Sequence, residues 1–260
     1  MSSRPSDPPD ISEWRPALIA KKVAFDVARA AVKNLSESGA HFVRHEEFSS
    51  LASATPADWA RFAENWDDLK LDTFMADGGT YRYRRYDQFD IDVESSQLTL
   101  LPHRPYRQET TVNQLNGGVD RLYESLTEKF LGEPLLRNVL MELAGLFSDV
   151  DGARRWNVKV TPIRIIAAQD QVGQPTPEGR HSDGGTFITS LMIGRKNVTG
   201  GESSVYTEDG DCLVTTILSE PGDILLNDDR RLLHEVTPLH PENNDEPGYR
   251  DVLVIAFTSL

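Results

Sequence analysis

The chain of 260 residues has a single cysteine and little positive charge for its length. Cys212 cannot form an internal disulfide, so the fold must be stabilised by packing, which fits a reducing cytoplasm. Lys and Arg number 27 against 41 Asp and Glu, and the formal net charge of -14 argues against an extended phosphate-binding surface. We therefore expect no nucleic-acid partner, although an acidic protein can still hold a small basic pocket.

Long apolar runs and long linkers are also missing. The sequence has no run of about 18 apolar residues, and its start, MSSRPSDPPD, has no positively charged stretch that leads into an apolar segment. We therefore expect a cytoplasmic protein with no membrane partner. Because neither a low-complexity linker nor an internal repeat divides the chain, we expect a disordered N-terminus over residues 1–15 and one domain over residues 16–260. Whether the protein forms a homo-oligomer stays open.

The half of the chain over residues 16–150 has mainly helical patterns. Between Ala17 and Leu35, apolar residues recur with the spacing of one helical face. Thr55-Pro56-Ala57-Asp58 is typical of a helix start, with a capping hydroxyl, a proline at the first position and an acid three residues after the cap. A third helical block is predicted from about Gly118 to Phe147, divided by Pro134.

One segment of this half, GGTYRYRRYDQFDIDV, alternates arginine with tyrosine before it becomes apolar. Such alternation predicts a strand with one face exposed. In an acidic chain, its arginines are expected either on a solvated strand face or in contact with an anionic substrate.

After residue 151 the sequence becomes rich in β-branched residues. Five apolar segments follow one another, separated by Gly, Pro, Asn and Asp: WNVKVTPIRIIAA, TFITSLMIG, SSVYTEDGDCLVTTIL, GDILLNDDRRLLHEV and RDVLVIAFTSL. Successive short strands without intervening helices predict an antiparallel sandwich or barrel. The expected architecture is thus α+β, mainly β, with a β core over residues 151–260 that the helices of residues 16–150 buttress.

The stretch EGRHSDGGTF contains a candidate metal site. In a strand, residues i and i+2 project from the same face, so His181 and Asp183 can point at one ion. This pair alone is a weak signal, and His234 is the best candidate for a third ligand. Two histidines and one carboxylate leave coordination positions open on Fe(II), whereas a structural zinc site would usually have cysteines or a fourth ligand.

An iron oxygenase that uses a 2-oxo acid also needs a cation for the distal carboxylate, and arginine has the best geometry for it. Arg250 opens the last predicted strand and shares a strand face with apolar residues. If that face lines the barrel, Arg250 is a buried cation that requires an anionic partner. Arg230 and Arg231 are alternatives, but the neighbouring aspartates could already neutralise them.

The motifs HSDG, RKNVTGGESSVY, PGD, HEVTP and RDVLVIAF together resemble the bacterial Fe(II)/2-oxoglutarate-dependent dioxygenases of the L-isoleucine 4-hydroxylase type, which act on free L-amino acids. The resemblance spans roughly Trp156 to Leu260. It implies a distorted double-stranded β-helix, a jelly-roll or cupin-like core, with catalytic iron held by His181, Asp183 and His234, and 2-oxoglutarate held by Arg250.

The resemblance also implies a reaction. The enzyme would hydroxylate an unactivated C–H bond of a free L-amino acid or a close derivative, consuming O2 and releasing succinate and CO2, with ascorbate as a reductant in vitro. Related halogenases carry a small residue in place of the aspartate, so Asp183 favours hydroxylation. Which amino acid and which carbon are oxidised stays open.

Several residues could bind the substrate. Glu178 could pair with a substrate ammonium group or be an exposed loop acid, and Arg164 could receive a substrate carboxylate or pair with one of the many acids of the chain. Gln108, Asn113 and Asn116 are polar candidates in a loop that could cover the site.

Three other functions compete with the amino acid hydroxylase. A cupin-like metalloprotein, either an isomerase or a small-ligand binder, would have the metal site without 2-oxoglutarate turnover. An oxygenase could instead act on a peptide or protein side chain. A non-catalytic interaction protein would need neither the histidines nor the arginine.

Overall fold

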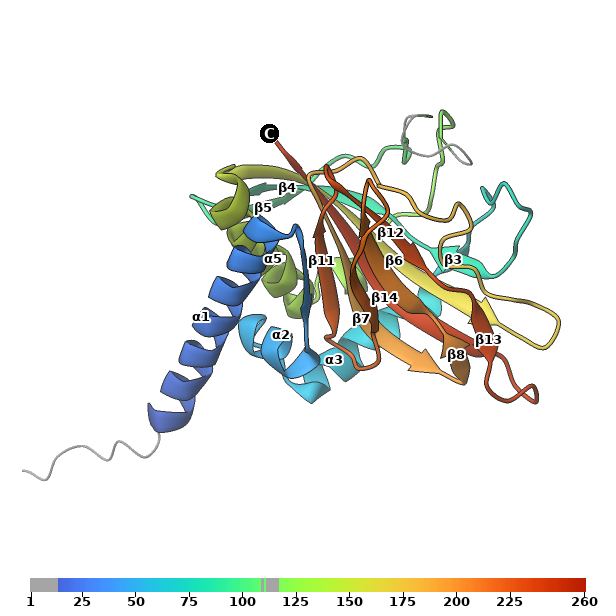
Figure 1. The fold of residues 1–260 in the computed structure, drawn as a ribbon, viewed down its shortest axis with the longest axis horizontal. Helices are drawn as coiled ribbons and strands as arrows, with labels where there is room; N and C mark the ends of the chain where they lie inside the picture. The colour runs from blue at the N-terminus through green and yellow to red at the C-terminus, as the bar shows by residue number, and fades with distance from the viewer. Residues whose placement is uncertain (1–13, 109, 111–116) are drawn as a thin grey trace, which may run out of the picture.

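The computed structural model describes residues 14–108, 110 and 117–260 of the chain (Figure 1). The predicted disordered N-terminus lies, up to residue 13, outside the described residues. The helical elements in the described part are α1 (Trp14–Glu37), α2 (His45–Leu51), α3 (Pro56–Ala63), the 3-10 helix η1 (Glu64–Asp68), α4 (Glu128–Leu131) and α5 (Pro134–Asp151). None of these helices is both long enough and apolar enough to cross a membrane.

The strands pair in antiparallel fashion throughout. The main sheet has the order β1 (Ala40–Val43), β11 (Ile224–Asp228), β7 (Phe187–Lys196), β14 (Gly248–Ser259), β6 (Arg155–Ala167), β3 (Arg82–Arg84) and β2 (Lys70–Leu71). Strand β4 (Asp87–Asp92) also pairs with β6, and with β5 (Gln97–Leu100). The smaller sheets are β10 (Cys212–Ile217), β9 (Glu202–Thr207) and β12 (Leu232–Val236), and the pair β13 (Leu239–Pro241) and β8 (Val198–Gly200).

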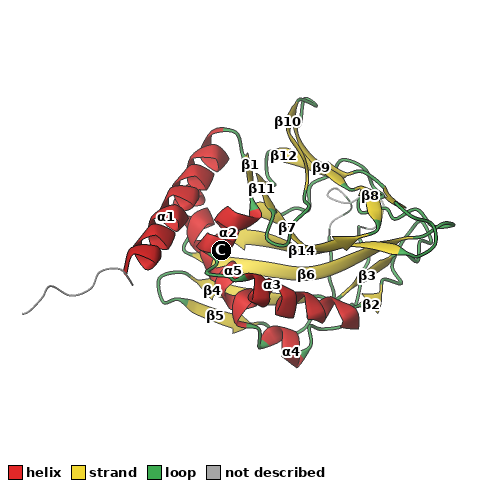
Figure 2. Cartoon of the chain, turned by 90° about the horizontal axis from the view of Figure 1, so that it is seen from below, coloured by secondary structure: helices red, strands yellow, loops and turns green. Residues whose placement is uncertain are grey.

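The two faces of the main sheet have different surroundings. Alternate residues of β6, among them Trp156 and Val158, belong to the largest apolar core together with Phe147 of α5. Figure 2 shows α3 and α4 on one side of β6 and β14, with β9, β10 and β12 on the other side. The residues between them along β6, such as Lys159 and Thr161, line a cavity on the opposite face. The predicted jelly-roll core with helical buttress is therefore confirmed.

The helix signals at Ala17–Leu35 and at Thr55 are confirmed. Helix α1 contains the first. At the second, the Asp58 backbone N–H donates to the Thr55 hydroxyl at 3.2 Å and the Thr55 N–H donates to the Asp58 carboxylate at 2.9 Å. This reciprocal pair satisfies two N–H groups that the start of α3 would otherwise leave without partners.

The third helical prediction is wrong over residues 118–127. Helix begins only at Glu128, and Tyr106 and Arg121 exchange backbone hydrogen bonds of 2.8 and 3.0 Å instead. Leu122, which the helical spacing would place in register with Leu126 and Phe130, is 62% exposed. Backbone pairing with a distant segment of the same chain has overridden the local helical pattern, because helix propensity is a weak preference.

The first half of the chain also contributes more strand than its pattern predicted. Strand β1 extends the main sheet next to β11, and β3 and β4 both pair with β6. Residues 40–100 thus complete the sheet that carries the cavity.

Candidate active site

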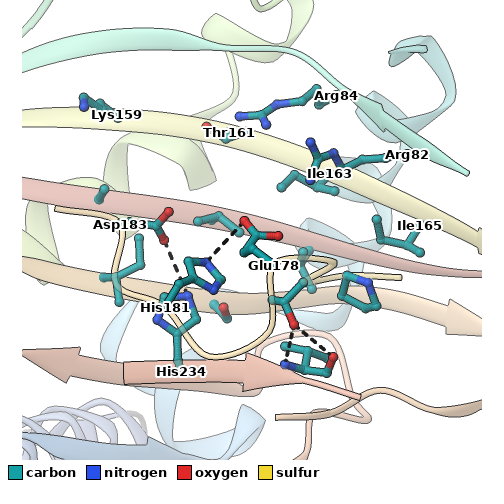
Figure 3. Close-up of a pocket in the computed structure, with 18 of the residues that line it drawn as sticks. Arg82, Arg84, Lys159, Thr161, Ile163, Ile165, Glu178, His181, Asp183 and His234 are labelled. Carbon is teal, nitrogen blue, oxygen red and sulfur yellow. Dashed lines mark hydrogen bonds and ion pairs between the residues drawn. The ribbon is translucent and has the colours of Figure 1, made fainter. Parts of the chain in front are cut away.

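Two of the three candidate metal ligands lie opposite each other in the backbone. His181 forms an isolated antiparallel bridge with His234 of β12, through N–H to carbonyl hydrogen bonds of 3.1 and 2.9 Å. His181 was predicted in a strand, but its pairing is an isolated bridge outside the named strands. Ligand atoms of His181, Asp183 and His234 all lie within 4.8 Å of one another at the cavity wall (Figure 3). The structure therefore brings the predicted triad together.

Hydrogen bonds orient the ligand atoms. The Nδ1–H of His181 donates to the Gly179 carbonyl at 2.8 Å, which leaves Nε2 as the lone-pair atom. Gln108 Nε2 donates to Oδ1 of Asp183 at 3.1 Å, while Oδ2 lies 3.5 Å from Nε2 of His234. One oxygen of Asp183 is thus held by an amide and the other faces the histidine.

Asp229 holds the segment that carries Asp183. Its carboxylate accepts from the backbone N–H of Asp183 at 3.0 Å and of Gly185 at 2.8 Å. Burial, together with the charge of Asp183, raises the pKa of Asp229 to about 7. Asp229 therefore holds in place the backbone of a candidate metal ligand.

The electrostatics of the triad suit a divalent cation. Burial and the neighbouring His181 lower the pKa of His234 to about 4, which keeps its imidazole neutral. Burial also opposes ionisation of Asp183, but the two histidines and Gln108 outweigh it and lower its pKa. Burial opposes protonation of His181, but Asp183 and Glu178 outweigh it and raise its pKa, so a bound cation would have to displace that proton. With both imidazoles neutral, two histidines and a carboxylate are the ligand set of an open Fe(II) site, so the donor chemistry fits that metal.

Arg250 lies in the same cavity as a buried cation. It is 2% exposed and lines the cavity together with Val252 and Val254 of the same strand. Its guanidinium donates to the Ser203 hydroxyl at 3.4 Å, whereas its Nε, within the described part of the chain, has no hydrogen-bond partner. Burial and Arg195 lower the pKa of Arg250 to about 10. An anion with a planar carboxylate would satisfy this group.

The candidate substrate residues have different positions. Glu178 lines the cavity, with its carboxylate 3.7 Å from Nε2 of His181. Arg164 points to the other face of β6, where it donates to both oxygens of Asp251 at 2.8 Å. Of the two roles expected for Arg164, the structure shows the ion pair with an acid of the chain. Asn113 and Asn116 lie outside the described residues.

The arginines of the RYRRY segment are not on a solvated face. Arg82 and Arg84 line the cavity and are 6% and 7% exposed, and Arg82 donates to the buried Asp72 at 2.8 Å. Arg121 and Lys159 line the same cavity. Sequence reasoning missed these last two, because single cations without a motif give no signal.

Comparison with known proteins agrees with this geometry. Residues 63–256 match the family described as 2OG-Fe dioxygenase. The chain belongs to that family. Fe(II), 2-oxoglutarate and O2 are accordingly its metal and co-substrates, and the protein is a 2-oxoglutarate-dependent dioxygenase. This membership disfavours the cupin-like metalloprotein without 2-oxoglutarate turnover.

Named relatives cover most of the chain. L-isoleucine-4-hydroxylase of Bacillus thuringiensis is 24% identical, over 84% of this chain and 87% of that protein. The 3(1)-hydroxy-L-isoleucine 4-dioxygenase of Pantoea ananatis is also 24% identical, over 86% and 93%. Among solved structures, a bsmA homologue from Methylobium petroleophilum is 33% identical with a TM-score of 0.83, covering 89% of this chain and 93% of that one.

Proposed function

We propose that this dioxygenase hydroxylates an unactivated C–H bond of a free L-amino acid or a close derivative, with release of succinate and CO2. The observation that carries the proposal is the cavity in which a triad of two histidines and one aspartate faces a buried arginine. The names of the two relatives, which describe oxidation of isoleucine and hydroxyisoleucine, support the class of substrate.

The proposal assigns a role to each residue of the site. His181, Asp183 and His234 would hold Fe(II), which when bound supplies the activation of O2 that C–H oxidation requires. Arg250 would bind the distal carboxylate of 2-oxoglutarate through its planar fork. Glu178 would accept hydrogen bonds from the substrate ammonium group at the edge of the triad.

The chain itself orients the reactants and excludes water. The apolar side chains of Val252, Val254 and Ala256 line the cavity between the end with Arg250 and the triad. Gln108 and Asp229 keep Asp183 in place during turnover. A substrate fixed in this cavity would present one C–H bond to the metal, and such positioning accounts for selectivity between chemically similar carbons.

The test is a screen of free L-amino acids with the purified protein, Fe(II), 2-oxoglutarate and ascorbate. We expect succinate release coupled to a product that is heavier by one oxygen atom, and loss of both signals in His181→Ala and Asp183→Ala. Metal binding without 2-oxoglutarate turnover would contradict the proposal. Turnover only with peptides would instead indicate an oxygenase of protein side chains.

A further inference from the structure

Three cations surround one aromatic ring in the cavity. The distances to the ring centroid of Tyr106 are 5.2 Å from the Arg84 guanidinium carbon, 4.8 Å from that of Arg121 and 5.2 Å from Nζ of Lys159. All four side chains line the same cavity as the triad. Because like charges repel, such a group is stable only if anions or π faces compensate for it.

These cations have few acidic partners in the described chain. Arg121 donates to the side-chain amide oxygen Oε1 of Gln108 at 2.7 Å. The Nε atoms of Arg121 and Arg84 are buried and have no hydrogen-bond partner among the described residues. Arg84 lies 3.8 Å from Asp72, but that carboxylate already pairs with Arg82 at 2.8 Å. Lys159 lies over the ring of Tyr106, and burial lowers its pKa although Asp183 and Asp229 act in the opposite direction.

The cluster lies apart from the end that holds Arg250. On β6, Lys159 is opposite Ala256 of β14, whereas Ile165 is opposite Arg250. Two alternate positions of one strand face, Thr161 and Ile163, therefore lie between Lys159 and the level of Arg250. The cluster is close to the triad, because the side chain of Gln108 accepts a hydrogen bond from Arg121 and donates one to Asp183. Figure 3 shows Arg84 and Lys159 on the strands that face the triad across the cavity.

The charges of the cavity do not balance with a neutral amino acid. Fe(II) and Asp183, taken with 2-oxoglutarate and Arg250, sum to zero. The pair of Arg82 and Asp72 is also neutral. With Asp183 counted against the metal, Glu178 is the remaining acidic residue among the described ones that line the cavity with Arg84, Arg121 and Lys159. Among these described groups, a zwitterionic amino acid would leave a net charge of two positive, whereas a second carboxylate on the substrate would compensate one of those charges.

We infer that Arg84, Arg121 and Lys159 form an anion subsite around Tyr106 and that the substrate is an acidic amino acid carrying a second carboxylate. This inference rests on the proposed function, because it takes Arg250 as the 2-oxoglutarate partner. Two guanidinium groups and one ammonium offer more donors than one carboxylate can accept, and they can bind both carboxylates of such a substrate.

Equilibrium binding tests the subsite without turnover. The protein is loaded with Mn(II) and N-oxalylglycine, a 2-oxoglutarate analogue that cannot be decarboxylated, and titrated in a calorimeter with two pairs of equal shape: L-glutamate and L-glutamine, L-aspartate and L-asparagine. We expect at least one acid to bind about tenfold or more tightly than its amide. If both amides bind as tightly as the acids, or more tightly, the inference is wrong.

Two variants with the same substitution provide the control. Lys159→Met removes one charge of the cluster without replacing a metal ligand, and should weaken binding of the acid about tenfold and that of the amide by a smaller factor. Lys196→Met removes an exposed charge that pairs with Glu246 at 3.2 Å, and should change neither. Equal weakening of acid and amide by Lys159→Met would argue against an anion subsite.

Succinate release separates this inference from the function on which it rests. If Fe(II) and 2-oxoglutarate give succinate with neutral amino acids and not with the acids, the dioxygenase function stands and the acidic substrate is refuted. If the acids bind selectively but no amino acid stimulates succinate release, the subsite stands and the proposed hydroxylation falls.

Discussion

Arg250 has a positive charge that the described part of the protein does not neutralise with an ion pair. Burying an unpaired cation costs several kcal/mol of folding free energy unless a partner compensates. The protein therefore tolerates a destabilising group at the position where the proposed co-substrate would supply a carboxylate. Such a residue should be important for binding and unfavourable for stability.

Replacing this arginine should separate the two effects. We expect Arg250→Met to raise the KM for 2-oxoglutarate about 100-fold, since two charge-assisted hydrogen bonds are lost, while the Tm of the ligand-free protein stays equal or rises. Steady-state succinate release and thermal unfolding measure the two quantities. Arg250→Lys, which keeps the charge but not the fork, should have an intermediate KM. A large fall in Tm with an unchanged KM would contradict this role.

The sequence indicated the candidate triad and Arg250 because their neighbours form motifs with recognisable spacing. Arg121 and Lys159 have no such context, and their convergence on Tyr106 depends on a bridge between residues 106 and 121. Arg84 was visible in the RYRRY segment, but its exposure could not be decided from alternation alone. A strand face that lines a polar cavity has the same pattern as one that faces water.

Strands after residue 151 were predicted well, because β-branched residues and turn residues agree there. Strand β1 was not, since its four residues, AHFV, lack a clear period. The helix predicted from Gly118 failed for another reason. The Tyr106–Arg121 bridge uses backbone groups that a helix would need, and sequence cannot show a partner 15 positions away.

Helix α3 offers a pH-dependent test of a local signal. Hydrogen bonds from Thr55, with a further one from Arg61, lower the pKa of Asp58 to about 2 from its usual 3.8. Because the folded-state pKa is the lower one, ionised Asp58 stabilises the protein above about pH 4. This stabilisation is lost as the pH falls from 4 towards 2.

We therefore expect Asp58→Ala to lower the urea midpoint at pH 7, with a difference from wild type that shrinks as the pH falls below 4. Thr55→Ala should cost about 1 kcal/mol at pH 7 through loss of the cap. Urea unfolding at several pH values measures both. Asp149→Ala, at an exposed position of α5, serves as a control and should leave the midpoint nearly unchanged. A difference for Asp58→Ala that is constant with pH would refute the assignment.

The triad exists only in the folded chain, because the bridge that joins His181 to His234 connects segments far apart in sequence. Ligands that bind the folded state alone must raise its stability. With Mn(II) and N-oxalylglycine at about 100 times their Kd, the gain is about 2.7 kcal/mol for each site. We expect a rise in Tm of several degrees, by scanning calorimetry, that EDTA reverses.

The same scan in His181→Ala supplies the matched comparison. This variant should keep the wild-type Tm without metal to within a few degrees and lose the metal-dependent rise. An unchanged rise would mean that Mn(II) binds elsewhere on the acidic surface.

The position of β14 has a consequence for how the chain acquires its fold during synthesis. In the main sheet β14 lies between β6 and β7, although β7 ends at Lys196 and β14 begins only at Gly248. During synthesis on the ribosome, the edges of β6 and β7 that pair with β14 therefore stay unpaired until β14 has been synthesised. Such exposed edges invite pairing with other nascent chains, so this protein should fold slowly and need protection by chaperones until the cavity closes.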